Sequence, residues 1–214
     1  MRIGRQGYRY LLFDSPSDHE VDDILPTECD TIRVVLCNRT LKSRLKIHRC
    51  SSINSLRKLG RPSYPGIRFA HLSSHGSKDG IHLIRDRPIA WKDVAIMLRN
   101  QEGSLHLSQQ RVLSLSTCSS SYGANEMAAH LQGFFTIMYY FHEESIEFSE
   151  SVTVWSMFYL KKNLSDPHEK IGEYINDFFE KSSGKKIIAY RYLKALSDRG
   201  LKAIRGRPGG TRRK

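Results

Sequence analysis

A cysteine and a histidine end two apolar segments, and this pair is the part of the sequence best suited to chemistry. Segment 112–118 has the composition of a buried strand that stops at Cys118, and small polar residues follow it. A helix is expected from about Asn125, and a helix N-terminus near a cysteine favours the nucleophilic thiolate. Segment 67–77 also reads as a strand, with His75 at its end. In one parallel sheet these strand ends would bring His75 and Cys118 together as base and nucleophile.

Each member of the pair has a rival. Cys37 ends an apolar run, residues 32–37, which we expect to be another strand, but the residues after it are not small. His71 lies inside the apolar run that leads to His75, and this favours a buried or supporting position. A zinc site of His71, His75 and Cys118 lacks ordinary ligand spacing. The four cysteines contain no C-x-x-C motif, so neither a zinc site nor a thioredoxin-type motif is indicated.

Length and composition indicate one globular domain. The chain has 214 residues, of which 39% are hydrophobic, and no apolar run approaches the roughly 18 residues of a membrane span. The N-terminus lacks the apolar segment of a signal peptide. These features predict a cytoplasmic protein whose cysteines are free thiols.

Positive charge is concentrated at the C-terminus. The formal net charge is +12, and residues 185–214 alone carry +10. We therefore expect a domain over residues 1–191 and a basic helix or tail over 192–214, partly disordered. Such a tail can contact nucleic acid, anionic lipid or an acidic partner, although a solvated end is the simpler interpretation.

Strand and helix patterns alternate along the chain. This alternation predicts an α/β protein with a mainly parallel central sheet of about six strands and helices on both faces. One helix start is well marked, with Asp166 as the expected N-cap, Pro167 at the first helical position and Glu169 completing a capping box. The expected strands are 8–13, 32–37, 45–48, 67–77, 112–118, 134–141 and 187–190, with a hairpin over 80–91; the expected helices are 51–60, 91–100, 127–131, 146–162, one from 167 and one over 192–204.

The histidine block Phe69–Gly76 and the cysteine block Leu113–Ser120 resemble those of the caspase-like cysteine peptidases, clan CD with the caspase–hemoglobinase fold. With the hairpin and helix between the blocks, the strand 133–140 and the helix around 154–160, the details look most similar to the bacterial CHAT-type proteases. The resemblance covers about residues 8–190. It implies a caspase-like sheet and hydrolysis of peptide bonds by a dyad of Cys118 and His75. It also implies that the backbone N–H groups of Gly76 and Cys118 hold the oxyanion and that no metal or organic cofactor takes part.

The substrate side of the resemblance is less complete. Many relatives carry an acidic residue or glutamine two positions before the cysteine, where this sequence has Ser116. Ser116 predicts a small, neutral pocket floor, with no support for a basic residue at P1, the position whose carbonyl is attacked. An aspartate at P1 would need arginines, for which Arg33 and Arg39 are candidates. The resemblance also suggests substrate contacts from Ser74, Ser116 and Ser119.

Three classes of function follow. The resemblance implies a cysteine endopeptidase that acts on a protein partner, such as a gasdermin in a bacterial defence or cell-death system, with or without an activating protein. The alternative is an inactive caspase-like binding module that acts through protein or nucleic-acid contacts of the basic tail. A nucleic-acid-binding α/β protein is a third reading, but its tail lacks interleaved stacking aromatics. The intact pair His75 and Cys118 favours the enzyme.

Overall fold

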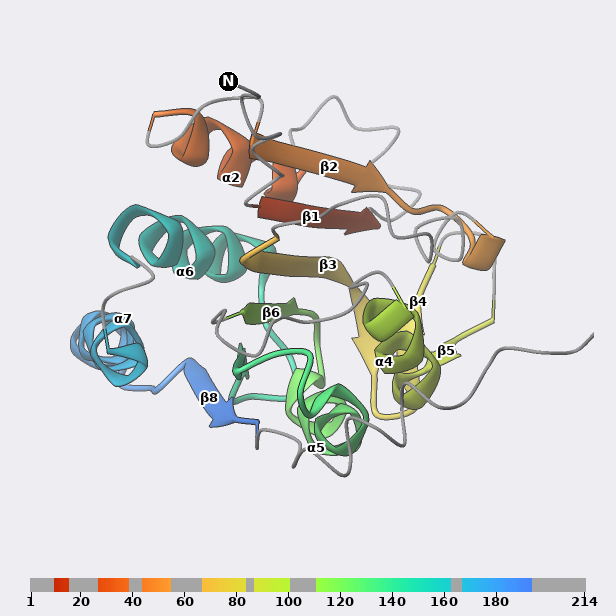
Figure 1. Cartoon of the computed structure of the whole chain (residues 1–214). Coiled ribbons are helices and arrows are strands. Elements are labelled where there is room, and N and C mark those ends of the chain that lie inside the picture. Colours follow the sequence, from red (N-terminus) through yellow and green to blue (C-terminus); the bar gives the residue numbers. More distant parts are fainter. Residues whose placement is uncertain are drawn as a thin grey trace, which may run out of the picture.

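A six-stranded sheet forms the centre of the protein. The computed structural model describes residues 10–15, 27–38, 44–54, 67–83, 87–100, 111–162 and 167–193. The strands are β1 (Tyr10–Ser15), β2 (Leu45–Arg49), β3 (Phe69–Ser77), β6 (Val112–Ser116), β7 (Ile137–Phe141) and β8 (Ile188–Tyr192). Their order is β2-β1-β3-β6-β7-β8, and every neighbouring pair is parallel except β7 and β8 (Figure 1). The predicted sheet of about six mainly parallel strands is therefore confirmed.

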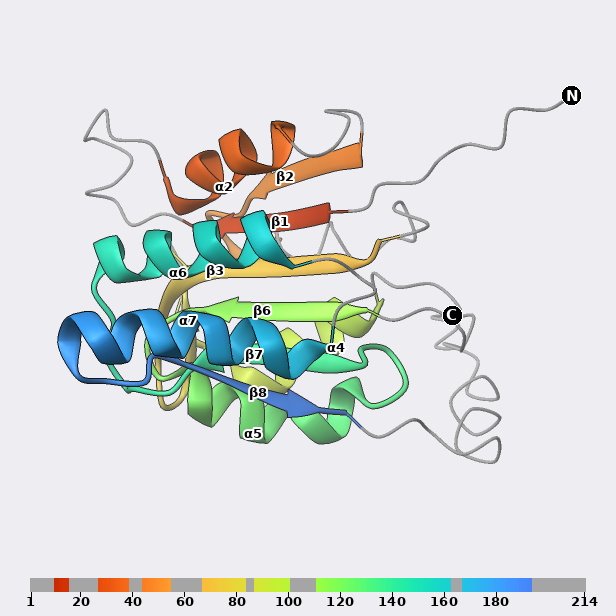
Figure 2. The same cartoon turned by 90° about the vertical axis from the view of Figure 1, so that its left-hand side faces the viewer.

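Helices cover both faces of this sheet, as predicted. On one face lie α2 (Glu28–Cys37), α6 (Phe148–Lys161) and α7 (His168–Ser183), and on the other lie α4 (Trp91–Asn100) and α5 (Ser120–Leu131) (Figures 1 and 2). Each layer has its own apolar core. Trp155 and Phe158 centre the first core and Trp91 and Met127 the second. None of these described helices is long and apolar enough to cross a membrane.

The register of the parallel strands places one row of polar residues at their carboxyl ends. Asp14 of β1 is opposite Ser73 of β3, and Ser73 is opposite Ser116 of β6. Residues directly opposite each other on neighbouring strands point to the same face of a sheet. This row faces the α2 and α6 side, where Asp14 contacts Thr27 before α2. The row therefore lies under the start of α2.

One predicted strand is wrong. Residues 32–37 belong to α2, whose N-cap Thr27 accepts a hydrogen bond from the Asp30 backbone N–H at 3.2 Å. The β-branched residues Val34 and Val35 favour strands in isolation, but burial of the apolar helix stripe decides the structure. The buried apolar side chains of α2 follow helical spacing: Cys29, Ile32 and Leu36.

Two helix starts also differ from expectation. Helix α5 begins at Ser120, directly after the cysteine turn, and not near Asn125. At α7, Pro167 is the N-cap and His168 is the first helical residue. The prediction that Pro167 is the first helical residue is therefore wrong by one position. The expected N-cap, Asp166, lies outside the described residues.

The remaining predicted elements are present where they are described. The hairpin consists of β4 (Gly80–His82) and β5 (Ile89–Ala90), and the predicted helix over 91–100 is α4. Strand β8 continues to Tyr192, and the buried Leu193 donates its N–H to the Thr136 carbonyl at 2.9 Å. The packed body thus reaches two residues past 191. Most of the predicted helix over 51–60, and the tail from 194 onward, lie outside the described residues.

Candidate active site

A pocket of about 110 Å³ opens at the carboxyl ends of the parallel strands, on the α2 and α6 side. Cys118 and His75 both line it, so the structure brings together the pair that the sequence singled out. Of the predicted substrate-contacting serines, Ser74 and Ser116 line the pocket, and Ser119 does not. The starts of α2 and α6 close the other side, where Ser151 is among the lining residues.

Cys118 lies in a tight turn between β6 and α5. The next residue, Ser119, is the only described non-glycine residue with a left-handed backbone, at φ 55°. The Ser119 N–H donates to the Glu144 carbonyl at 2.7 Å, and the Cys118 thiol lies 3.9 Å from the Ile146 carbonyl as a donor. The turn is thus fastened to the β7–α6 connection, and the half-buried thiol is set two residues before a helix N-terminus.

His75 lies on an arm that leaves the main sheet. Strand β3 pairs with β6 only as far as Ser73, and its outer residues pair with β4, His75 opposite His82. The buried Trp91 holds this arm by donating its ring N–H to the Ser77 carbonyl at 3.1 Å. The same ring packs on Gly123 of α5, where a Cβ would lie 2.6 Å from it. Trp91 therefore fixes the histidine arm against the helix that follows the cysteine.

Gly76 is the contact between the arm and the cysteine turn. A Cβ at Gly76 would lie 2.6 Å from the Cys118 carbonyl oxygen and 2.8 Å from Thr117 Oγ1. Real Cβ atoms are almost never found that close to backbone, so only glycine permits this approach. The position that the resemblance assigned to oxyanion binding therefore lies directly against the backbone of Cys118.

A buried polar network lies beside the pocket, and sequence reasoning missed its central residue, Glu28. Glu28 Oε1 pairs with His71 Nε2 at 2.7 Å, and Glu28 Oε2 accepts a hydrogen bond from Ser116 Oγ at 2.7 Å. Ser151 Oγ donates to the same Oε2 atom. All four side chains are at most 5% exposed. His71 is thus buried as predicted, but the predicted neutral floor at Ser116 is wrong, because a carboxylate lies beside it.

Glu28 has three hydrogen-bond partners in this network. His71 Nε2 pairs with Oε1, and the Ser116 and Ser151 hydroxyls donate to Oε2. His71 Nδ1 has no partner among the described residues, and Ser116 Oγ also lies 2.7 Å from Ser151 Oγ. Glu28 is also the first residue of α2, where the helix dipole favours negative charge.

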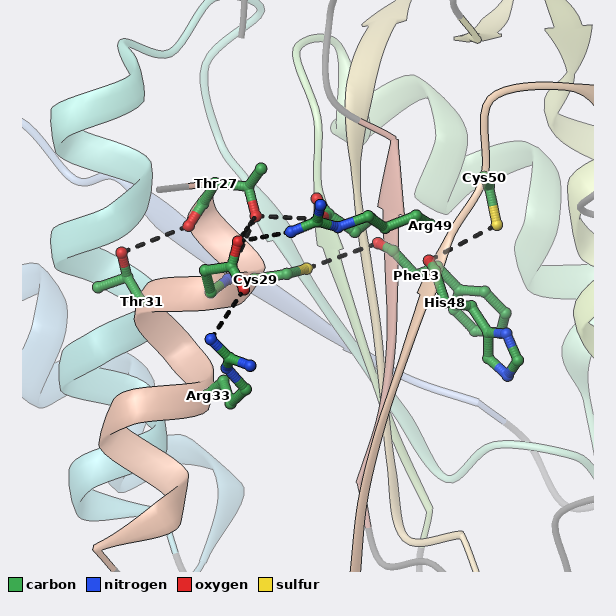
Figure 3. A network of polar contacts seen from close by, with 10 residues as sticks. Phe13, Thr27, Cys29, Thr31, Arg33, His48, Arg49 and Cys50 are labelled. Atoms are coloured by element: carbon green, nitrogen blue, oxygen red, sulfur yellow. Dashed lines mark hydrogen bonds and ion pairs between the residues drawn. The ribbon is translucent and has the colours of Figure 1, made fainter. Parts of the chain in front are cut away.

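Asp14 is the second carboxylate of the pocket. Asp14 Oδ2 accepts a hydrogen bond from Thr27 Oγ1 at 2.9 Å and lies 3.6 Å from Arg49 Nε. Burial raises the pKa of Asp14, against the lowering effects of Thr27 and Arg49. Figure 3 shows Arg49 reaching from β2 toward Thr27; its other ion pair, with Asp30 at 2.8 Å, is the shorter one.

The other cysteines differ from Cys118 in position. Cys29 is fully buried, and burial raises the pKa of its thiol well above the usual range, while burial raises the pKa of Cys50 to about 12. Cys37 is exposed at the far end of α2. A ten-residue helix is about 15 Å long, so this rival is separated from the pocket by the length of α2. Among the described residues, Cys118 is the only cysteine that lines the pocket.

Neither arginine that was considered for an acidic P1 residue is placed in the pocket. Arg33 lies on α2, is half exposed, pairs with Asp30 at 3.3 Å and does not line the pocket. Arg39 lies outside the described residues. Within the described ranges, no group of three or more His, Cys, Asp or Glu side chains is arranged to hold a metal ion.

Comparison with known proteins found no protein-family model and no curated protein that matches this chain. Function is therefore inferred from the pocket itself. Its defining features are a cysteine before a helix, a histidine on the neighbouring strand and two acidic side chains beside them.

Proposed function

We propose that this protein is a cysteine endopeptidase of the caspase-like type, with Cys118 as nucleophile and His75 as the group that transfers protons. The observation that carries the proposal is that these two residues, from different strands, line one pocket at the carboxyl edge of a parallel sheet. Helix α5 begins two residues after Cys118, so the cysteine lies in a turn at a helix N-terminus. The α/β architecture agrees with the family that the histidine and cysteine blocks resemble.

In the acylation half of the reaction, His75 takes the proton of the Cys118 thiol. The Sγ atom attacks the carbonyl carbon of the substrate peptide bond, a C–S bond forms and the carbonyl electron pair moves to oxygen. The Gly76 and Cys118 N–H groups are the proposed donors to this oxyanion. When the intermediate collapses, the C–N bond breaks and the His75 imidazolium gives its proton to the leaving amine, which leaves a thioester on Cys118.

Deacylation repeats these roles with water. His75 takes a proton from a water molecule whose oxygen attacks the thioester carbonyl. The C–S bond breaks, the product leaves as a carboxylic acid and the Cys118 sulfur regains a proton from His75. Proton, nucleophile and leaving group are all accounted for by these two side chains and water, without a metal or organic cofactor.

The substrate we propose is a protein, cut in the cytoplasm as part of a bacterial defence or cell-death system of the gasdermin type, with an activating protein partner as an option. This setting is carried by the family resemblance of the two sequence blocks. The chemistry at Cys118 is testable without knowing the partner.

The test is to incubate the purified chain with a broad peptide library and with peptidyl acyloxymethyl ketones, which alkylate active-site thiolates. We expect cleavage and a single mass adduct for the wild type, and neither for Cys118→Ala. His75→Ala should lose cleavage, and Cys37→Ala, which changes the exposed cysteine at the far end of α2, should behave as wild type. If Cys118→Ala cuts as well as wild type, the proposal is wrong. If the folded wild type neither cuts nor is labelled, the binding-module alternative is favoured.

A further inference from the structure

Three side chains meet at the tip of the arm that carries His75. The arm, residues 75–82, turns back after Ser77, and Lys78 is the first residue of this two-residue turn. Lys78 Nζ lies 3.2 Å from Glu144 Oε1 and 5.0 Å from the centre of the Tyr122 ring. The Tyr122 hydroxyl donates to the same Glu144 oxygen at 2.9 Å. Lys78, Tyr122 and Glu144 thus form a closed cluster, which we call the clasp.

The three members of the clasp come from three separate parts of the site. Lys78 follows His75 by three residues, and Tyr122 lies in the first turn of α5, the helix that starts just after Cys118. Glu144 lies in the connection between β7 and α6, residues 142–147. The clasp therefore joins the histidine side of the pocket to the cysteine side.

Glu144 holds the cysteine turn with its backbone and the arm with its side chain. The Glu144 carbonyl accepts a hydrogen bond from the Ser119 N–H at 2.7 Å, directly after the cysteine. Two residues further along the same connection, the Ile146 carbonyl lies 3.9 Å from the Cys118 thiol. Because the Glu144 carboxylate pairs with Lys78, the position of the arm tip is coupled to the position of the cysteine turn.

The arm depends on such contacts because the main sheet does not extend along it. Strand β3 pairs with β6 only as far as Ser73, and residues 75–77 pair with β4. Trp91 holds the arm at the Ser77 carbonyl, and the clasp holds the next residue. Lys78 and Glu144 are 56% and 59% exposed, so their contact is weak and screened by salt. Such a contact adds little to global stability, but it can shift the balance between two positions of a locally held segment.

We propose that Lys78, Tyr122 and Glu144 are positioning residues, which keep His75 and Cys118 in the relative position that proton transfer needs. This inference rests on the proposed peptidase function. None of the three lines the pocket, so they act through the arm and the cysteine turn and not on the substrate. Reacting groups lose rate steeply when they are misplaced by even about 1 Å, so a weak clasp can still affect the rate.

The test measures how fast a peptidyl acyloxymethyl ketone with an uncharged peptide labels Cys118. The maximal labelling rate is separated from the reagent concentration that gives half of it. Lys78→Met removes the charge and keeps most of the side chain. We expect its maximal rate to fall about 3- to 10-fold, the size typical of one or two exposed contacts, and the half-saturating concentration to stay within about 2-fold of wild type. Lys78→Arg, which keeps a cation over the Tyr122 ring, should restore at least about half of the wild-type rate.

Two further measurements separate positioning from a general loss of structure. The double variant Lys78→Met with Glu144→Gln should label no more slowly than Lys78→Met alone, because both changes open the same clasp. Raising the salt concentration from about 50 to about 500 mM should bring the wild-type rate towards that of Lys78→Met, since salt screens exposed pairs. The rate of Lys78→Met itself should change by less than about 2-fold.

Lys161→Met is the matched control. Lys161 also lies over an exposed tyrosine ring, that of Tyr174 at 5.5 Å, but it joins α6 to α7 and does not line the pocket. Its labelling rate should stay within about 2-fold of wild type. A wild-type rate for Lys78→Met, additive losses in the double variant or an equal loss for Lys161→Met would overturn the inference and leave the peptidase proposal intact. If no electrophile labels Cys118 in the folded wild type, both are overturned.

Discussion

His71 and His168 are both buried next to aromatic rings on the α2, α6 and α7 side of the sheet, but their hydrogen-bond partners differ in charge. His71 lies edge-on to Trp155 and pairs with the carboxylate of Glu28. His168 pairs through Nδ1 with the Tyr139 hydroxyl at 2.9 Å. The first network borders the pocket, and the second lies between α7 and β7, away from it.

The hydroxyl network needs no charge. The Tyr139 hydroxyl donates its proton to the His168 carbonyl at 3.0 Å, so the hydroxyl oxygen is left to accept. A neutral His168 ring with its proton on Nδ1 donates to that hydroxyl oxygen. His168 Nε2, unpartnered within the described residues, is then a bare acceptor. Burial, with a smaller contribution from Lys162, lowers the pKa of His168 to about 4. The comparison shows that the imidazole paired with a hydroxyl lies in the core away from the pocket, whereas the imidazole paired with a carboxylate lies beside the pocket.

Removing the carboxylate should have the largest effect. Glu28→Ala leaves three buried donors, on His71, Ser116 and Ser151, without their acceptor. Each buried donor left without an acceptor typically costs about 1–3 kcal/mol, and Ser116 and Ser151 keep their mutual hydrogen bond at 2.7 Å, so we expect a loss of about 2–5 kcal/mol in the free energy of unfolding measured with urea. The control is Glu144→Ala, at an exposed pair with Lys78, which should leave the free energy of unfolding nearly unchanged because water screens the pair. Equal losses of unfolding free energy for Glu28→Ala and Glu144→Ala would contradict the prediction that the buried network is the stronger one.

The neutral network should produce a pH dependence in stability. The unfolded chain protonates His168 near its ordinary pKa of 6.5, but the folded chain only near about 4. As pH falls through this window the unfolded state binds the extra proton, so stability is lost, by up to about 3 kcal/mol. Urea titrations of wild type and His168→Gln, which lacks the group, should diverge between pH 6.5 and 4 and run parallel above pH 7.5. Parallel curves throughout would refute the assignment.

Two glycines test whether a new Cβ costs more against backbone than against a side-chain ring. Gly76 lies beside the pocket, and Gly172 lies in α7. Gly76→Ala places a Cβ 2.6 Å from the Cys118 backbone, and we expect a loss of about 1–3 kcal/mol in stability and of about 100-fold in cleavage as the cysteine turn shifts. Gly172→Ala in α7 meets only the Tyr190 ring, at 3.1 Å. The ring can move slightly and alanine favours the helix, so stability should change by less than about 1 kcal/mol and cleavage should not change. Urea denaturation measures the stability of both variants, and kcat/KM measures their cleavage. A Gly76→Ala variant that cleaves as fast as wild type would contradict the prediction.

The smallest effect should come from the outer edge of the His168 region. Tyr192, 47% exposed, donates its hydroxyl to Glu169. Because water replaces an exposed hydrogen bond, Tyr192→Phe should cost less than about 1 kcal/mol of unfolding free energy. Tyr139→Phe, which removes the buried hydroxyl between His168 Nδ1 and its carbonyl, should cost more. If urea denaturation shows a larger loss for Tyr192→Phe than for Tyr139→Phe, the buried hydrogen bonds between Tyr139 and His168 do not stabilise the core as expected.

The placement of His75 and Cys118 in one pocket was predictable from local patterns, because each residue ends an apolar run and parallel strands share a carboxyl edge. Glu28 was not predictable in this way. Its partners His71, Ser116 and Ser151 are 43, 88 and 123 residues away in the sequence, so only the folded chain shows that they meet. The acidic character of the pocket depends on these distant pairings, and a reading limited to Ser116 missed it.

The error at α2 has a different cause. Residues 32–37 are rich in β-branched side chains, and this outweighed a helix signal that was present, Thr27 as N-cap with Glu28 and Asp30 in the first turn. Reading the cap first would have placed Glu28 at a helix start facing the strand ends. The alternation of strands and helices and the mainly parallel sheet were easier to predict, because long apolar runs leave fewer choices.

The arm that carries His75 has a consequence for how the protein opens. Residues 69–73 of β3 are paired on both sides, with β1 and β6, whereas His75 and the two residues after it pair with β4 alone. Backbone amides in singly paired, exposed segments open with lower free energies than those in a central strand. Hydrogen–deuterium exchange along β3 should therefore be slow as far as Ser73 and accelerate from His75 onward. His75 then belongs to a less protected unit than the strand that leads to Cys118, so the arm can open while the sheet behind Cys118 stays intact.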